Sequence, residues 1–142
     1  MPAKDIYHDT VRNALVKDGW TITHDPLKFK WEETDLFVDL GAEKFILAEK
    51  DKHLIAVEIK SFIGKSKVTD LENALGQYIL YFDVLEESES QRKLYLAINS
   101  TVYEKVFTNS IGQLPIKKGR LLLLVFDEDT EEIVKWIPNI KI

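Results

Sequence analysis

Apolar residues near the N-terminus recur with the spacing of an amphipathic helix. The positions that carry the pattern are Tyr7, Val11, Ala14 and Leu15. Residues with the spacing i, i+4, i+7 and i+8 share one helix face, so we predict a helix from about residue 5 to residue 17. Asp5 is expected to cap its first turn and Gly19 to end it.

A longer helical pattern begins at Thr69-Asp70-Leu71-Glu72, which matches a capping box, and extends to about Glu86. Its apolar stripe consists of Leu71, Ala74, Leu75, Tyr78, Phe82 and Leu85. We therefore predict a long amphipathic helix with this stripe against the core.

The other apolar runs are short and predict strands. We expect strands near Thr21 and over Leu36–Leu40, then a hairpin over Phe45–Lys60 that turns at Asp51-Lys52. The later segments are a strand over Lys93–Asn99, a short helix opened by Thr101–Glu104, a loop marked by Gly112 and Pro115, and strands over Arg120–Phe126 and Glu132–Ile137. The order α-β-β-β-α-β-α-β-β predicts a mixed α/β fold.

The composition limits the number of domains and the class of protein. A chain of 142 residues with 45% hydrophobic residues fits a single domain over residues 1–142. The absence of cysteine excludes disulfides and thiolate zinc sites. Residues 1–10 lack the apolar core of a signal peptide, and no apolar run approaches the roughly twenty residues of a membrane span. We expect a cytoplasmic protein with no membrane segment.

The net charge of −5 weighs against non-specific binding of nucleic acid by the bulk surface. Basic residues nevertheless gather in or beside predicted loops, at Lys28, Lys30, Lys65, Lys67, Lys117, Lys118 and Arg120. They either form a local binding surface or only keep a small domain in solution, and the pattern leaves both interpretations open.

Glu58 and Lys60 lie two residues apart at the end of the apolar run Leu54–Ile59, and so share one face of a predicted strand. Burying a carboxylate and an ammonium group is costly unless they are paired or bound to a metal. Asp39 is a second lone carboxylate, inside the run Leu36–Leu40. Two such acids can hold a hard divalent cation, and a nearby lysine can orient a water molecule or neutralise charge on a phosphate. These residues predict a site that cleaves phosphodiesters.

At these residues the chain resembles the PD-(D/E)xK nuclease superfamily, whose pattern is an acid on one strand and Glu-x-Lys on the next. Three segments are similar to XisH-type excision controlling factors, which are linked to excision of a DNA element in cyanobacteria. They are Asp39-Leu-Gly-Ala-Glu43, Ala56-Val-Glu-Ile-Lys-Ser-Phe62 and Gly76-Gln-Tyr-Ile-Leu-Tyr81. The likeness spans nearly the whole chain, with Val38 in place of the usual proline before the acid.

The resemblance implies a restriction-endonuclease-like core, in which a central mixed β-sheet is flanked by helices. It also implies that Asp39, Glu58 and the Ile59 carbonyl hold Mg²⁺ (or Mn²⁺), and that Lys60 positions the attacking water and stabilises the phosphate.

The resemblance extends to residues on the two helices. Gln77 and Tyr81 belong to a Gln-x-x-x-Tyr pattern that points at the metal site or the nucleic-acid backbone, although both also suit the edge of the helix stripe. Asp9 is the candidate for an extra metal ligand on the first helix. Chemistry alone instead predicts that Asp9 and His8 are solvated surface residues.

The predicted hairpin provides a rival for the first acid. A turn at Asp51-Lys52 places Glu43 opposite Lys60 and leaves Asp39 beyond the regular pairing unless the strand bends at Gly41. Glu43 is then either the metal ligand or a cross-strand partner of Lys60. We favour Asp39, because the family pattern matches there.

Two classes of function remain. The first is a metal-dependent endodeoxyribonuclease. The second is a non-catalytic accessory factor that assists a site-specific recombinase together with an XisI-type companion, both of which the resemblance implies. Self-association as a homo-oligomer is left open. The sequence lacks the motifs of hydrolase triads, nucleotide triphosphatases and zinc peptidases.

Overall fold

The computed structural model describes residues 4–46, 51–88 and 90–140. Its helices are α1 (His8–Lys17), α2 (Lys67–Glu87), α3 (Ser100–Val102) and α4 (Ser110–Lys117), with a π-helical turn η1 (Tyr103–Phe107) between the last two. Its strands are β1 (Thr21–His24), β2 (Leu27–Trp31), β3 (Thr34–Val38), β4 (Leu40–Ile46), β5 (Asp51–Ile59), β6 (Lys93–Asn99), β7 (Leu123–Asp127) and β8 (Glu132–Ile137).

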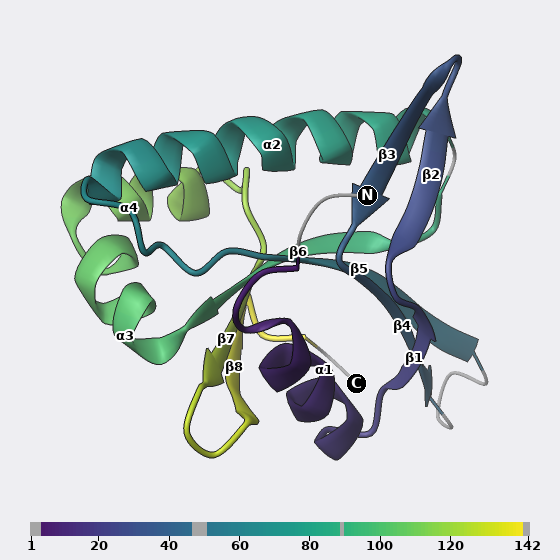
Figure 1. The fold of residues 1–142 in the computed structure, drawn as a ribbon, viewed down its shortest axis with the longest axis horizontal. Coiled ribbons are helices and arrows are strands. Elements are labelled where there is room, and N and C mark those ends of the chain that lie inside the picture. The colour runs from purple at the N-terminus through teal and green to yellow at the C-terminus, as the bar shows by residue number, and fades with distance from the viewer. Residues whose placement is uncertain (1–3, 47–50, 89, 141–142) are drawn as a thin grey trace.

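A six-stranded sheet with the order β1-β4-β5-β6-β7-β8 forms the centre of the fold. The sheet is mixed, because β5, β6 and β7 run parallel while the outer pairs are antiparallel. α2 lies across one face of the sheet and α1 lies on the other (Figure 1). The predicted mixed α/β fold, with a central sheet flanked by helices, is confirmed.

Alternating side chains of the central strands build two hydrophobic cores, one on each face of the sheet. Ala56 and Leu96 belong to the core under α2, whereas Val57 and Tyr95 belong to the core under α1. Because side chains alternate along a strand, Glu58 lies on the same face as Ala56. The alternation therefore directs this carboxylate towards α2.

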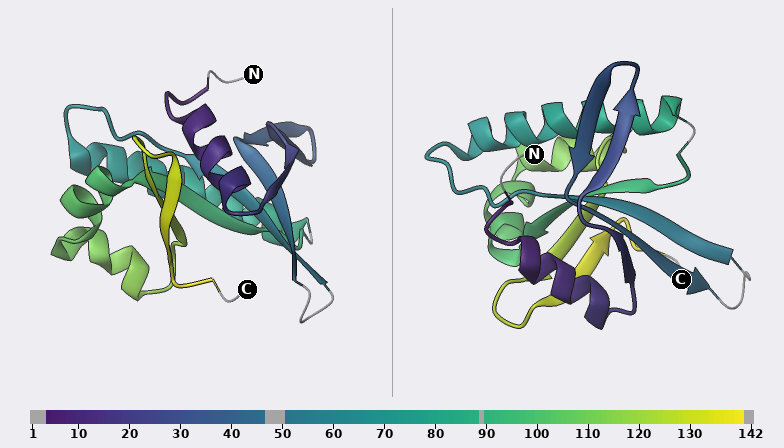
Figure 2. Two further views of the ribbon diagram at one scale, coloured as in Figure 1. Left: turned by 90° about the horizontal axis from the view of Figure 1, so that it is seen from below. Right: turned by 45° about the vertical axis from the view of Figure 1, so that its right-hand side comes forward.

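β2 and β3 form a separate two-stranded hairpin, which projects from the sheet beside the C-terminal half of α2 (Figures 1 and 2). The rings of Phe29 and Tyr81 meet edge to face, 5.7 Å between centroids, and so join the hairpin to the helix. The sequence pattern did not predict β2, a five-residue strand in which lysines alternate with apolar residues. The strand predicted over Leu36–Leu40 is divided at Asp39 in the structure.

The β4–β5 hairpin has a different register from the predicted one. Glu43 pairs with Leu54 instead of Lys60, a shift of six positions, and Asp51 and Lys52 are strand residues instead of turn residues. The connection, residues 47–50, lies outside the described residues. Because the shift is even, every side chain keeps its predicted face. The periodicity thus identified the faces of the strands but not their alignment.

The start of each of the two longest helices differs from its prediction. α1 begins at His8, whose N–H bonds the main-chain carbonyl of Asp5. α2 begins at Lys67, because the Ser66 hydroxyl accepts a hydrogen bond from the Thr69 N–H (3.2 Å) and caps the helix earlier than the predicted box. Phe82, predicted in the core stripe, is 44% exposed.

The segment predicted as a loop at Gly112 and Pro115 is α4. The Asn109 side chain caps it by accepting a hydrogen bond from the Gly112 N–H (2.9 Å). A Cβ at position 112 would lie 1.9 Å from the Val106 carbonyl oxygen, so the glycine allows α4 to pack against η1. β7 begins at Leu123 instead of Arg120, whereas β6 and β8 have the predicted bounds.

Among the described residues, no helix combines the length and the apolar character that a membrane span requires.

Candidate functional site

Asp39 lies at the bend where the chain leaves the β2–β3 hairpin and enters the central sheet as β4. Leu40 pairs with Val57, so Asp39 comes beside Glu58 without any bend at Gly41. The Asp39 main-chain N–H donates to Glu58 Oε1 (3.3 Å), and the Ile59 N–H donates to Asp39 Oδ2 (2.7 Å). These two hydrogen bonds hold the two carboxylates side by side.

Lys60 lies at the end of β5, two residues beyond Glu58. Its Nζ is 3.7 Å from Glu58 Oε2, and its main-chain N–H donates to the Ala97 carbonyl (3.1 Å), which fixes the end of the strand against β6. The Lys60 side chain is 33% exposed, whereas that of Glu58 is 6% exposed. The ammonium group therefore lies between the buried carboxylates and solvent.

The surroundings of Glu58 disfavour its charged form. Burial and the nearby charge of Asp39 raise the pKa of Glu58 to about 9, although Lys60 acts in the opposite direction. Like charges this close repel strongly in a buried position. The pair therefore holds a proton at neutral pH, or a cation that takes its place.

α2 contributes Gln77 and Tyr81 to the same place. Gln77 Nε2 donates to the Tyr81 hydroxyl oxygen (2.8 Å). Burial raises the pKa of Tyr81, the Gln77 hydrogen bond lowers it, and the charges of Glu58 and Asp39 raise it further. Both α2 residues thus face the carboxylates.

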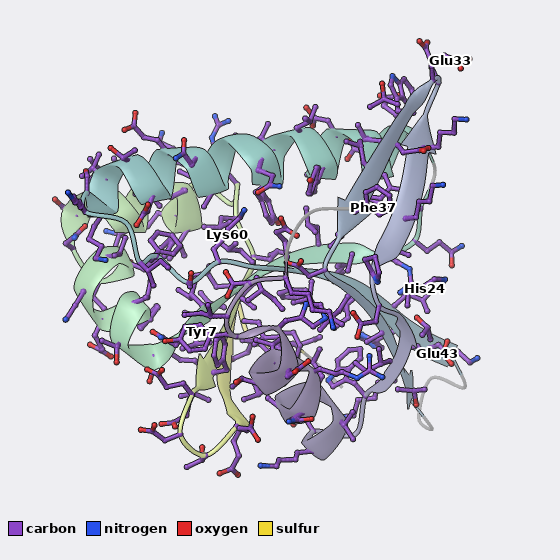
Figure 3. The ribbon with its side chains drawn as sticks, viewed as in Figure 1. Tyr7, His24, Glu33, Phe37, Glu43 and Lys60 are labelled. Atoms are coloured by element: carbon purple, nitrogen blue, oxygen red, sulfur yellow. The ribbon has the colours of Figure 1, made fainter. Side chains whose placement is uncertain are left out.

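The side chains described above line one pocket of about 170 Å³, together with Asp5, Phe37 and Ile59. A second hollow of about 230 Å³ continues from it along the segment after β5, and Asp5 and Lys60 line both. In Figure 3, Phe37 and Lys60 lie below α2, whereas Glu43 lies far along β4.

Asp9, predicted as an extra metal ligand, is exposed on α1 and does not line this pocket. The acid that reaches it from the N-terminal segment is Asp5, which was expected only to cap the helix. Asp5 accepts hydrogen bonds from the Tyr7 N–H (2.9 Å) and the Ser61 N–H (3.1 Å). No local pattern indicates this contact, because residues 5 and 61 meet only in the folded chain.

Glu43 is not part of the pocket. Its carboxylate lies 3.4 Å from Lys52 Nζ, on the neighbouring strand. The prediction that Glu43 pairs with Lys60 is therefore wrong, and the structure brings Asp39 to Glu58 and Lys60 instead.

His8, predicted at the surface, is buried on α1. Its Nε2 lies 2.6 Å from Asp25 Oδ1, and Arg12 contacts the other oxygen of the same carboxylate. The prediction failed because Asp25 follows β1 and meets α1 only through the tertiary fold. This contact joins α1 to the segment after β1, away from the pocket of Asp39.

The donor set suits a hard divalent cation. Within the described residues, no group of three or more His, Cys, Asp or Glu side chains lies close enough together to hold a metal. Asp39 and Glu58 nevertheless offer carboxylate oxygens from the bend before β4 and from β5. Mg²⁺ usually keeps several water ligands, so a few protein ligands suffice.

Two solved structures are similar to this chain. One is a crystal structure of an XisH family protein from Nostoc punctiforme PCC 73102, with 36% sequence identity and a TM-score of 0.82. The other is a crystal structure of an fdxN element excision controlling factor protein from Anabaena variabilis, with 37% identity and a TM-score of 0.82. Each match covers 94% of this chain and 99% of the other.

A comparison with curated proteins found no match. The family model described as XisH protein matches residues 1–134, which is most of the sequence. Together with the two solved structures, this match shows that the chain belongs to the XisH family.

Proposed function

We propose that this protein is a divalent-metal-dependent DNA endonuclease with a restriction-endonuclease-like core of the PD-(D/E)xK type. The observation that carries the proposal is the convergence of Asp39, Glu58 and Lys60 in one pocket. An acid on one strand and Glu-x-Lys on the next is the superfamily pattern that the sequence resembles. The register places these residues together, although they are about twenty positions apart in the chain.

Asp39 and Glu58, with the main-chain carbonyl of Ile59, would hold Mg²⁺ or Mn²⁺. The metal would supply Lewis-acid stabilisation of the charge that develops on the phosphate. Two carboxylates beside a single lysine leave a net negative charge when both are ionised, and a cation would compensate that charge.

Lys60 lies where a cationic residue could assist phosphodiester cleavage. Its ammonium group is close to Glu58 and still accessible from solvent, so it can contact a substrate phosphate and orient the attacking water. Gln77 and Tyr81 offer an amide and a hydroxyl on the α2 side of the pocket, where they would hold the substrate backbone.

We further propose that the substrate is DNA and that the activity serves the excision of a DNA element. The support is the family, together with the Anabaena variabilis relative, which carries the name of an excision controlling factor. A site-specific recombinase and an XisI-type companion are the partners that this role implies.

The decisive experiment is a calorimetric titration of the full chain with Mg²⁺ and Mn²⁺, paired with nicking of supercoiled plasmid DNA. We expect the wild type to bind a divalent cation, and Asp39→Asn and Glu58→Gln to lose both binding and nicking. Glu43→Gln is the matched control, because this acid lies with Lys52 outside the pocket. Its metal binding and nicking should equal those of the wild type.

A wild-type protein that binds neither cation would overturn the metal site. Metal binding without nicking, with or without the proposed partners, would instead favour the accessory role. In that case the protein would bind DNA at the same pocket without cleaving it.

A further inference from the structure

A groove of about 340 Å³ runs along the side of α2 and shares no lining residue with the pocket of Asp39 and Glu58. One wall is formed by Tyr78, Ile79, Phe82 and Asp83 of α2. The other wall is the segment Gly119–Leu122, which leads from α4 into β7. The groove is thus a feature of the fold that the proposed chemistry does not use.

The apolar surface of α2 is wider than the core that covers it. Leu71, Tyr78 and Leu85 recur every seven residues and are buried. A second row, Val68, Leu75 and Phe82, lies beside them at the same spacing. Leu75 packs partly against the core, whereas Val68 and Phe82 are 49% and 44% exposed. Ile79 adds a further apolar side chain to this row and is 46% exposed. A helix with a second uncovered apolar row is typical of a surface that binds a partner.

Hydrogen bonds of Tyr78 hold the two walls of the groove in place. The Tyr78 hydroxyl donates to the Leu94 carbonyl (2.7 Å) and accepts from the Leu122 N–H (3.3 Å), which ties both walls together. The Phe82 ring stacks on that of Tyr78, 6.4 Å between centroids. A partner therefore meets a preformed surface and orders few side chains on binding.

The two walls carry opposite charges. Asp83 lies on the helix wall and Glu86 follows it one turn further along α2. Arg120 lies on the other wall, and Lys117 and Lys118 precede it in the chain. In the part of the chain that the structure describes, no ion pair joins these two groups. A partner that matches this surface must itself offer an apolar ridge with a basic side and an acidic side.

We propose that the partner is a second copy of this chain, in a two-fold dimer whose axis runs along the groove, so that the two α2 helices lie parallel. The chain itself carries an acidic wall and a basic wall, with apolar side chains between their charged groups. In a two-fold interface each feature is used twice, so Phe82 and Ile79 of each copy occupy the groove of the other. The acidic helix wall of each copy then faces the basic wall of its partner, which is the charge complementarity that selects this occupant.

The first test is sedimentation velocity of the full chain over a wide concentration range. We expect the wild type to dimerise and Phe82→Glu to raise the dimer Kd at least about tenfold, as for loss of a central aromatic contact. Leu80→Glu is the matched control, because Leu80 is 53% exposed on α2 but does not line the groove. Ile79→Lys repeats the test if Phe82→Glu folds poorly by circular dichroism.

A charge exchange tests which residues face each other. Asp83→Arg and Arg120→Asp should each weaken the dimer, and the double variant should restore it, because the pair re-forms between copies with its signs reversed. No restoration in the double variant would overturn the proposed orientation of the two copies.

Cross-linking gives a second readout, since the chain has no cysteine of its own. A short bis-maleimide should capture Ile79→Cys as a dimer and leave Leu80→Cys largely monomeric. A wild type that stays monomeric at the highest concentration, or equal dimerisation of Phe82→Glu and Leu80→Glu, would overturn the proposal. Neither outcome depends on metal binding or nicking, so this inference and the proposed function fail separately.

Discussion

Glu58 is a carboxyl group in a place where neither burial nor its neighbour Asp39 favours the charged form. Its pKa is raised from the ordinary 4.5 to about 9. Between these two values the folded protein binds a proton that the unfolded chain releases. The free energy of unfolding therefore falls as the pH rises through this window, by at most about 1.4 kcal/mol per pH unit.

We expect the wild type, kept in chelator, to lose stability towards urea between about pH 5 and about pH 9 more steeply than Glu58→Gln. The glutamine keeps the shape of the side chain but does not titrate. Added Mg²⁺ should act oppositely, stabilising the wild type more as the pH rises, because the metal needs ionised carboxylates. Equal pH slopes for the wild type and Glu58→Gln would contradict the raised pKa.

Lys60→Met separates a structural lysine from a catalytic one. At neutral pH Glu58 holds a proton when no metal is present, and a bound cation would compensate the charge of the ionised form. Loss of the ammonium group should therefore change the free energy of unfolding little, with or without Mg²⁺. Nicking of plasmid DNA should fall by orders of magnitude, because the phosphate loses its cationic partner. Unfolding in urea and a plasmid assay measure the two effects on the same preparation.

Two results would contradict this role of Lys60. One is nicking by Lys60→Met at the wild-type rate. The other is nicking by the wild type in excess chelator, since the proposed chemistry requires a divalent cation.

The residues of the site were predictable to different degrees. Asp39, Glu58 and Lys60 are polar side chains inside apolar runs, a conflict that is visible in the sequence itself. Asp5 gave no such signal, because its contact with Ser61 spans fifty-six positions and depends on the whole fold. The family pattern predicts a metal ligand at Asp9 on the first helix, whereas this residue is exposed in the structure.

At the scale of elements, periodicity predicted which segments are helices and strands better than it predicted their bounds and pairing. β6 and β8 have the predicted bounds, since each is a short apolar or alternating run with turn residues beside it. The predicted register of β4 and β5 was wrong. Residues two apart share a face of a strand, so several registers that differ by an even number of residues satisfy the same pattern. The register is set by tertiary packing.

α4 was missed because Gly112 and Pro115 disfavour helices when considered without their surroundings. The contact with η1 explains why position 112 is occupied by glycine. A Cβ at this position would lie 1.9 Å from the Val106 carbonyl oxygen and 2.7 Å from Phe107 Cα, and both are main-chain atoms that move only with the backbone. Packing here prevails over helix propensity.

This contact predicts opposite effects for two glycine substitutions. Gly112→Ala should lower the free energy of unfolding by about 2 kcal/mol or more, because η1 and α4 must separate. Gly76→Ala is the matched control in α2, where nothing lies within 4 Å of an added Cβ. It should raise stability by up to about 1 kcal/mol. Urea unfolding measures both, and a neutral Gly112→Ala would contradict the close approach.

At the scale of the whole molecule, the net charge of −5 repels DNA, so binding of the proposed substrate requires basic residues near the site. The basic residues near the site are few. Phe37 lines the pocket, and it pairs with Lys28 on the β2–β3 hairpin, so Lys28 and Lys30 lie on the same face as Phe37. Lys60 lies in the pocket, and Lys65 is exposed on the segment that follows β5. Lys67 donates to main-chain carbonyls of the same segment, beside the second hollow.

These five lysines limit how strongly DNA binding depends on salt. Each phosphate that a lysine neutralises contributes about −0.9 to the slope of log K against log salt, so the slope per protomer should be no steeper than about −4.5. Fluorescence anisotropy with labelled duplex DNA, in Ca²⁺ to prevent cleavage, measures it. Lys28→Gln and Lys30→Gln should each make the slope shallower by about 1, whereas Lys17→Gln on α1 should leave it unchanged. A slope near −8 would show that DNA contacts a much wider basic surface than the one beside this pocket, and would contradict the proposed mode of binding.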